Sequence, residues 1–249
     1  MTSNFEAGVE DVGAAVAAGR AVREHGPFGI EIADETLHFV SKVVQDPVIT
    51  GNQVLAAMQL RPVSDYLVFQ MLRDGALEEI RPEEEVDLRE AEIEKFLVFR
   101  SDRSFRFYID ERAFDWGAVH ISGSTLKRLG NLPAIGTDLW LDIVGGEDQL
   151  VGDRDLIDLS RPGVERFNSR PTRILIKVNS RDREVDHYEV GYWEIARLAF
   201  PNAVASSQTI YTIDYAAGPR QNPNGSMVDG QKALIKNGMK FYVTQTDKS

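Results

Sequence analysis

Three segments of this chain open a helix in nearly the same way, and that repetition constrains the fold more than any other feature. The segments are VITGNQV from Val48, HISGSTL from His120 and EVGYWEI from Glu189. The third residue of each segment, Thr50, Ser122 or Gly191, is placed as a helix N-cap with apolar residues on both sides, as in a hydrophobic staple. Since the openings lie roughly seventy residues apart, they predict an internal repeat.

The expected helices also end alike. Pro62, Pro133 and Pro201 follow the three N-caps by 12, 11 and 10 residues. Proline cannot continue a helix, and it disfavours helical backbone in the residue before it. The spacing therefore predicts three helices of about three turns, each beginning at its cap and ending at its proline.

Alternating apolar segments lie on both sides of each helix. FGIEIAD, SFRFYID and RILIKVN precede the helices as the first strand of a hairpin, and YLVFQML, DLWLDIV and TIYTIDY follow them. Period-two alternation is typical of half-buried strands. The closing strands repeat as well. EVDL and IEKF, which ends at Phe96, match LIDL and VERF, which ends at Phe167. Each repeat reads strand, strand, helix, strand, short strand, strand, which is the order of the ubiquitin-like β-grasp fold.

The fold class that follows is α+β, with three tandem ubiquitin-like β-grasp domains. The expected domains are residues 28–102, 103–170 and 171–249, the last including a C-terminal tail. Units of this length are close to the lower limit for independent folding, so contacts between neighbours contribute to stability. We expect separate domains arranged like beads, with links too short to let them swing freely.

Residues 1–27 lie outside the repeats and form a short N-terminal helical or disordered segment. Val9, Val12 and Val16 follow helical spacing in an alanine-rich stretch. One hypothesis is a helix lying on the first domain, or a partly disordered leader. The other is an arm for oligomerisation or for docking a partner, because its glycines weaken an isolated helix by about 1 kcal/mol each.

Charge and composition exclude several classes of protein. The net charge is -11, and residues 1–103 hold 20 Asp/Glu against 10 Lys/Arg. Such a chain repels nucleic acid and anionic membranes, and its acidic first half serves solubility or, alternatively, docks a basic partner. No apolar run approaches the roughly 20 residues of a membrane helix. The N-terminus lacks a signal-peptide pattern, so we expect a cytoplasmic protein.

No residue pattern predicts catalysis, a cofactor or a metal site. Cysteine is absent, which excludes a thiolate zinc site and a cysteine nucleophile. The histidines have no metal-ligand spacing, and the aspartates between Asp153 and Asp158 lack the glycine and glutamate of a calcium loop. The histidines are His25, His38, His120 and His187. Other features are interpreted as structural: a turn at Gly145-Gly146, a polar turn over 82–87, and core packing of Trp116, Trp140 and Trp193.

The chain resembles the bacterial multiubiquitin-domain family. The resemblance rests on the ITG and ISG helix openings, the EVDL and LIDL strands, IEKF and VERF, and the closing stretch PNGSMVDGQKALIKNGMKFYVTQTDKS. It covers most of the chain from about Phe28. It implies a protein modifier acted on by a ubiquitin-like activating enzyme, a conjugating enzyme and a deubiquitinase-like peptidase, encoded together in operons that look like anti-phage defence modules. A member of this family is a substrate of enzymes and not an enzyme.

A modifier of this type needs a flexible C-terminal tail with an accessible carboxylate. Phe241–Thr244 is the expected last strand, which leaves a conjugation tail of Gln245, Thr246, Asp247, Lys248 and Ser249. The terminal diglycine of ubiquitin is absent, so the tail is conjugated as it stands, trimmed first, or not conjugated. The alternative function is a structural scaffold that forms homo-oligomers, rings or filaments through β-grasp contacts. A self-assembling modifier combines the two functions.

Overall fold

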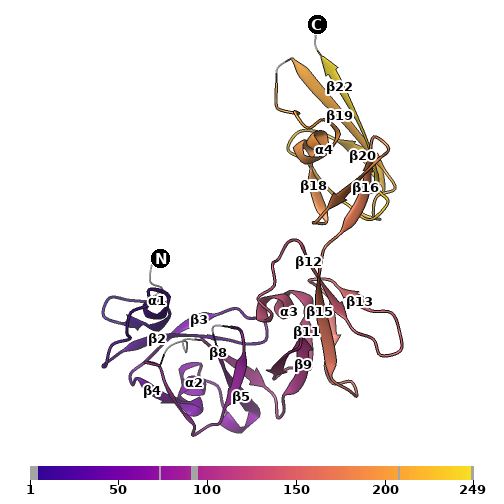
Figure 1. The fold of residues 1–249 in the computed structure, drawn as a ribbon. Helices are drawn as coiled ribbons and strands as arrows, with labels where there is room; N and C mark the ends of the chain where they lie inside the picture. The colour runs from indigo at the N-terminus through magenta and orange to yellow at the C-terminus, as the bar shows by residue number, and fades with distance from the viewer. Residues whose placement is uncertain (1–4, 73, 91–94, 207, 248–249) are drawn as a thin grey trace. The chain divides into compact units, whose positions relative to one another are not determined.

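The computed structural model describes residues 5–72, 74–90, 95–206 and 208–247 (Figure 1). The chain divides into two compact units. The N-terminal unit comprises Met1–Leu132 and Leu139–Ser169, and the C-terminal unit comprises Pro133–Asp138 and Arg170–Ser249. The N-terminal unit therefore holds the first repeat and most of the second, and the C-terminal unit holds the third repeat with one segment of the second.

The first repeat is built on a mixed sheet with strand order β1-β2-β8-β5-β6. Strand β3 pairs along one edge of β2, while β1 and β8 pair in parallel with successive parts of the other edge. The small ladder β4-β7 lies beside this sheet. The elements are β1 (Glu10–Asp11), α1 (Val12–Ala17), β2 (Phe28–Ala33), β3 (Val40–Val44), β4 (Val48–Thr50), α2 (Gly51–Ala57), the 3₁₀ turn η1 (Val63–Asp65), β5 (Tyr66–Met71), β6 (Leu77–Ile80), β7 (Glu85–Asp87) and β8 (Lys95–Arg100).

The second and third repeats share one strand order. The sheets run β10-β9-β15-β12-β13 and β17-β16-β22-β19-β20, with small ladders β11-β14 and β18-β21. The second repeat contains β9 (Phe105–Ile109), β10 (Arg112–Trp116), β11 (His120–Ser122), α3 (Gly123–Leu129), β12 (Thr137–Leu141), β13 (Gln149–Val151), β14 (Leu156–Asp158) and β15 (Glu165–Pro171). The third contains β16 (Ile174–Val178), β17 (Arg181–Val185), β18 (Glu189–Gly191), α4 (Tyr192–Ala199), β19 (Thr209–Ala216), β20 (Asn224–Met227), β21 (Lys232–Leu234) and β22 (Lys240–Asp247).

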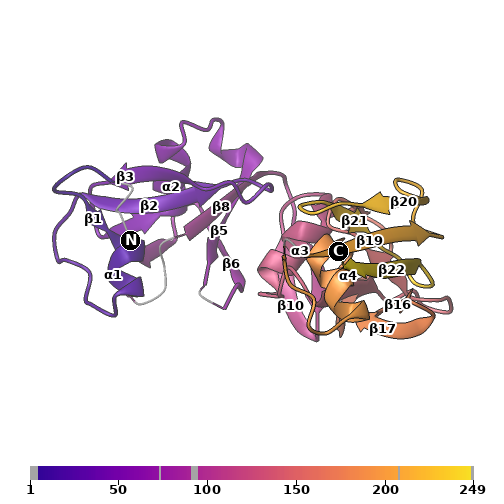
Figure 2. The same cartoon turned by 90° about the horizontal axis from the view of Figure 1, so that it is seen from above.

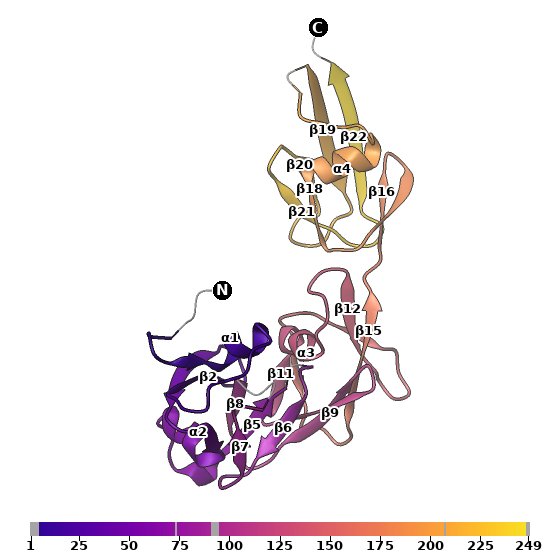
Figure 3. The same cartoon turned by 60° about the vertical axis from the view of Figure 1, so that its left-hand side comes forward.

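A common plan unites the three sheets. The first and last long strands of each repeat lie side by side and parallel, as β2 with β8, β9 with β15 and β16 with β22. The opening hairpin flanks this pair on one side, and the strand after the helix flanks it on the other. Figure 3 shows α4 lying across β19 and β22 on one face of the third sheet. The predicted strands and the single helix occur in the predicted order in all three repeats, but each repeat has two further short strands, which are β4 and β6 in the first.

The three helices begin where the sequence predicts, but two of them end early. The N-caps are Thr50, Ser122 and Gly191. Helices α2 and α3 contain only seven residues, because Gln59 and Asn131 adopt φ of 58° and 52° and close each helix in a left-handed cap. The prediction of three turns ending at a proline is wrong for these two helices. Helix α4 ends at Ala199, directly before the Phe200-Pro201 pair, so its end is close to the predicted one, although its eight residues make fewer than three turns.

The first two repeats share a continuous hydrophobic core, so the expectation of separate beads is wrong for this pair. The ring centroid of Phe99 in β8 lies 4.7 Å from that of Trp116 in β10 and 5.6 Å from that of Phe69 in β5. All three side chains are buried. Polar contacts border this core, because Arg128 of α3 donates to the Leu37 carbonyl at 3.1 Å. The two repeats therefore form one packed body within the N-terminal unit.

The cause of this fusion is an apolar second face on the first sheet. Side chains alternate across a strand, so the face opposite α2 normally meets water. In the first repeat that face carries Leu67, Phe69, Leu97 and Phe99, whereas the register-equivalent residues of the third repeat are Thr212, Asp214, Tyr242 and Thr244. A sheet that is apolar on both faces requires a cover on each, and the second repeat supplies one of them.

The N-terminal segment packs on the first repeat (Figure 2). Val12, Ala15 and Val16 of α1 are buried in the same core as the inner face of the first sheet. Glu10 is also buried and forms ion pairs with Arg20 and Arg23. The hypothesis of a helix lying on the first domain is confirmed, with a parallel strand preceding that helix. In the described part of the chain, no helix has the length and apolar character needed to span a membrane.

Candidate functional site

The repeated helix openings have a structural role, since their hydrogen bonds fix the start of each helix. The Thr50 hydroxyl accepts a hydrogen bond from the Gln53 backbone amide at 3.3 Å. The side-chain oxygen of Gln53 accepts one from the Thr50 backbone amide at 2.8 Å. A further amide at the helix start donates to a backbone carbonyl of the loop that precedes the second strand of the small ladder. In the second repeat, the Gly123 amide donates to the Asp155 carbonyl, just before β14, at 3.0 Å. A Cβ on Gly123 would lie 2.2 Å from the Gly152 carbonyl oxygen. The glycine of ISG is thus required by a close backbone approach, and the amides at this helix start are occupied internally.

The strand that leads into the predicted conjugation tail is longer than expected. Strand β22 continues to Asp247, and its register with β19 pairs Gln245 with Tyr211 and Thr246 with Ile210. The expectation that the last strand ends at Thr244 is therefore wrong. Backbone pairing needs no apolar side chain, so the polar sequence Gln-Thr-Asp did not reveal it. Lys248 and Ser249, the rest of the predicted tail, lie outside the described residues.

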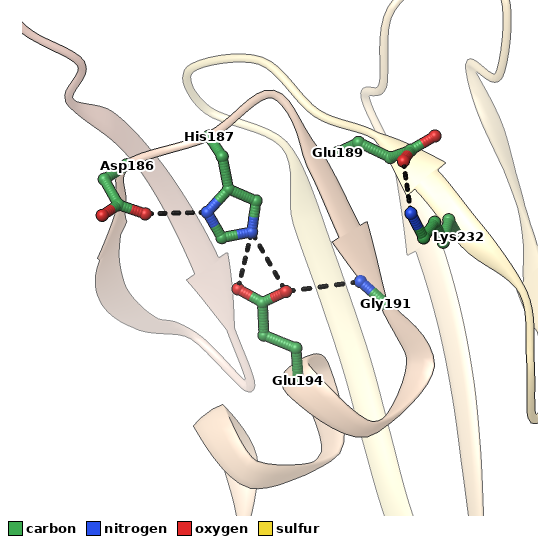
Figure 4. Close-up of polar contacts among 6 residues, drawn as sticks. All are labelled: Asp186, His187, Glu189, Gly191, Glu194 and Lys232. Atoms are coloured by element: carbon green, nitrogen blue, oxygen red, sulfur yellow. Dashed lines mark hydrogen bonds and ion pairs between the residues drawn. The ribbon is translucent and has the colours of Figure 1, made fainter. Parts of the chain in front are cut away.

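A charged cluster stands at the start of α4, and its members point toward one another in Figure 4. His187 Nδ1 lies 2.7 Å from an oxygen of Asp186, and His187 Nε2 lies 3.0 and 3.1 Å from the two oxygens of Glu194. Glu194 also accepts a hydrogen bond from the Gly191 amide at 3.3 Å. The histidine ring is thus held between two carboxylates, one of which caps the helix.

This geometry shifts the protonation of the cluster. The hydrogen bond that His187 donates to Asp186 raises the pKa of His187 above its ordinary 6.5, and the bond to Glu194 adds to this shift, although partial burial opposes it. The same contact lowers the pKa of Asp186. The sequence did not predict the cluster, since His187 was expected to be a surface or structural residue without metal-ligand spacing. The available signal was an Asp-His pair seven residues ahead of the glutamate that completes a capping box.

An acidic groove of about 350 Å³ lies in the first repeat, between β6 and the small ladder. Six carboxylate residues line it, which are Glu78, Glu79, Glu84, Glu85, Asp87 and Glu90. The predicted polar turn at Pro82 does lead into a strand, β7. Across the described residues, no three His, Asp or Glu side chains are grouped to hold a metal ion. The groove therefore concentrates negative charge on this repeat without forming a chelating site.

The tryptophans occupy three different environments. Trp116 is fully buried in the shared core, and Trp193 packs partly buried against the third core while donating to Asp229 at 2.7 Å. Trp140 lies between the buried Leu139 and Leu141 along β12, so its side chain is on the opposite face and is only partly buried. The interpretation as core residues is confirmed for Trp116 and does not hold for Trp140.

Comparison with known proteins gives one finding on the family. The family model described as Multiubiquitin matches residues 35–101, 105–172 and 174–247. These three matches follow the three sheets and together cover more than half of the chain. The comparison with curated proteins finds no match.

Proposed function

Because the chain belongs to the multiubiquitin family, we propose that it is a ubiquitin-like modifier joined to its targets through its C-terminal carboxylate. Each repeat is then a β-grasp domain, an assignment supported by the strand order and by the single helix after the opening hairpin. The observation that carries the proposal is that all three matches to the family fall on sheets of one common plan. No cysteine is present to offer a competing acyl-transfer group.

The proposal includes partners and a setting. An activating enzyme would adenylate the carboxylate of Ser249 with ATP and release pyrophosphate, and an enzyme nucleophile would then displace AMP to form an acyl intermediate. A conjugating enzyme would transfer the acyl group to a target amine, and a deubiquitinase-like peptidase would reverse the bond. We place this chemistry in the bacterial cytoplasm and in anti-phage defence. The protein takes part as a substrate, with no catalytic residues of its own.

The pairing of β22 adds a structural requirement to this function. Entry of the terminus into an enzyme channel demands an extended, unpaired backbone, whereas Gln245, Thr246 and Asp247 pair with β19. Activation therefore requires the end of β22 to separate from Thr209, Ile210 and Tyr211. Gln245 and Thr246 are polar and exposed, so separating this strand end costs less than separating a buried apolar strand.

The test is reconstitution with the partner enzymes followed by mass spectrometry of the products. We expect peptides in which the Ser249 carbonyl is joined to a lysine or another amine when ATP is present. A matched variant with four extra residues after Ser249 moves the carboxylate and should shift every adduct to the new terminus. A terminus that stays free with all partner enzymes and ATP present would refute the modifier function.

A scaffold remains the second candidate, because one observation favours it. Within the N-terminal unit, the edge of one repeat covers the sheet face of its neighbour. The same face of the third repeat carries exposed Leu175, Ile210 and Tyr242. Another copy of the chain could cover that face in the same manner and extend the assembly. Sedimentation at tens of micromolar would then show species larger than a monomer, and the substitution Tyr242→Lys should dissociate them.

A further inference from the structure

The loop between β17 and β18 connects two sets of interactions inside the C-terminal unit. Asp186 and His187 bond to each other, and His187 continues to Glu194 at the start of α4. The next residue, Tyr188, donates a hydrogen bond to Asp138 at 3.2 Å. Three consecutive side chains of one short loop thus link α4 to the segment Pro133–Asp138.

That segment runs into β12 and is held in the C-terminal unit by Thr172, which follows the neighbouring strand β15, and by the loop between β17 and β18. The Thr172 amide donates to the Gly136 carbonyl at 3.0 Å, and the Thr172 hydroxyl donates to Asp138 at 2.8 Å. Asp138 and Thr172 are both buried. Tyr188 supplies the other hydrogen bond to Asp138 from the loop that His187 stabilises. The position of this loop therefore affects how firmly the segment is bound.

We propose that the Asp186–Tyr188 loop is a proton-sensitive latch, in which a proton on His187 holds the segment Pro133–Asp138 against the third repeat. A doubly protonated imidazole has two N–H donors and satisfies Asp186 and Glu194 at once. A neutral imidazole has one N–H and can donate to only one of the two carboxylates. The other carboxylate then faces a ring nitrogen lone pair, and the loop loses one of its two charged hydrogen bonds.

The surrounding charges reinforce this effect. Asp186 faces the ring from its own loop and Glu194 faces it from α4. Glu184 of β17 lines the same hollow of about 340 Å³, although Arg173 lies 3.8 Å from its carboxylate. When His187 loses its proton, these three carboxylates stay close together, and only Glu184 keeps a nearby positive charge, that of Arg173. Their mutual repulsion then favours opening of the loop.

The direction of the pH dependence follows from the histidine. Its folded pKa is raised above the ordinary 6.5, so its stabilising contribution is complete below 6.5 and is lost as the pH rises through the folded value. Tyr188 does not compete in this range, because burial and the nearby Asp138 raise its pKa to about 12. The latch is closed in mildly acidic solution and loosens in mildly alkaline solution.

Amide hydrogen exchange of Thr172 in the full chain tests the latch. The protection factor, corrected for the intrinsic pH dependence of exchange, should fall about threefold to tenfold between pH 6 and pH 9, as expected for one partly exposed charged hydrogen bond. His187→Gln fixes a neutral side chain, so its Thr172 amide should show the low protection at both pH values. His120→Gln, which removes a histidine from the N-terminal unit, should behave as wild type.

Two results would overturn the proposal. One is a Thr172 protection factor that does not change with pH in the wild-type chain. The other is a pH dependence that persists in His187→Gln. Should that variant fold poorly, the wild-type chain decides the question through nuclear magnetic resonance: the midpoint of the His187 ring titration and that of the Thr172 protection must coincide, and separate midpoints exclude the latch.

Discussion

Truncating Phe99 to alanine should destabilise both of the first two repeats together. Phe99 belongs to the first repeat, but only 1% of it is exposed and its ring contacts Trp116 of the second repeat at 4.7 Å between centroids. It also packs edge-on against Phe69 at 5.6 Å. Replacing a buried phenylalanine by alanine costs about 3–5 kcal/mol, and each aromatic pair accounts for about 0.5–1.5 kcal/mol of such a loss. With two pairs lost at a fully packed site, we expect about 4 kcal/mol.

Urea denaturation followed by hydrogen exchange mass spectrometry measures this effect by region. Peptides from 28–100 and from 105–169 should lose protection at one common midpoint, and Phe99→Ala should lower that midpoint for both. Peptides from 174–247 should not change. The matched control is Thr244→Ala, because Thr244 occupies the same register position in the third repeat and is exposed. We expect that change to be nearly neutral.

Two outcomes would refute the argument. A loss below about 1 kcal/mol would mean that the Phe99 site is loosely packed, contrary to its burial. A midpoint shift confined to 28–100 would mean that the two repeats unfold independently and that their shared core contributes no cooperativity.

Three further substitutions test other parts of the structure. Thr50→Ala removes the side-chain cap of α2 and should cost about 1 kcal/mol in urea denaturation. Gly123→Ala places a Cβ 2.2 Å from a backbone oxygen and should lower the free energy of unfolding by more than about 2 kcal/mol, the scale of an overpacked site. Its control is Gly191→Ala, whose Cβ meets open space and which should cost much less. Glu10→Gln leaves Arg20 and Arg23 without a buried carboxylate and should lower the free energy of unfolding by about 2 kcal/mol. This is less than the loss of a fully buried ion pair, because both arginines are half exposed, and the loss should be smaller still in 1 M salt.

The repeat and its element order could be read from the sequence because local rules produce them. A cap residue, a staple and a helical period all act within a few residues, and each appears three times. Thr50 and Ser122 therefore marked helix starts that the structure confirms. The early ends of α2 and α3 escaped prediction because Gln59 and Asn131 adopt a left-handed conformation that neither residue type demands.

The fusion of the first two repeats left a signal that alternation alone did not capture. Residues Phe96 to Phe99 are apolar at four successive positions, and all four are buried. A continuous apolar run is typical of a strand covered on both faces. What the run does not specify is the partner, because Trp116 lies on another strand and reaches Phe99 only after both sheets have formed.

The sequence by itself determined three similar sheets and where their helices begin. Tertiary structure alone decided which repeats share a core, that β22 continues to Asp247, and that His187 lies between two carboxylates. The physical reason is range. Capping and periodicity depend on neighbours along the chain, whereas the ladder at Gln245 depends on the distant Tyr211, and its backbone hydrogen bonds form whatever the side chains are.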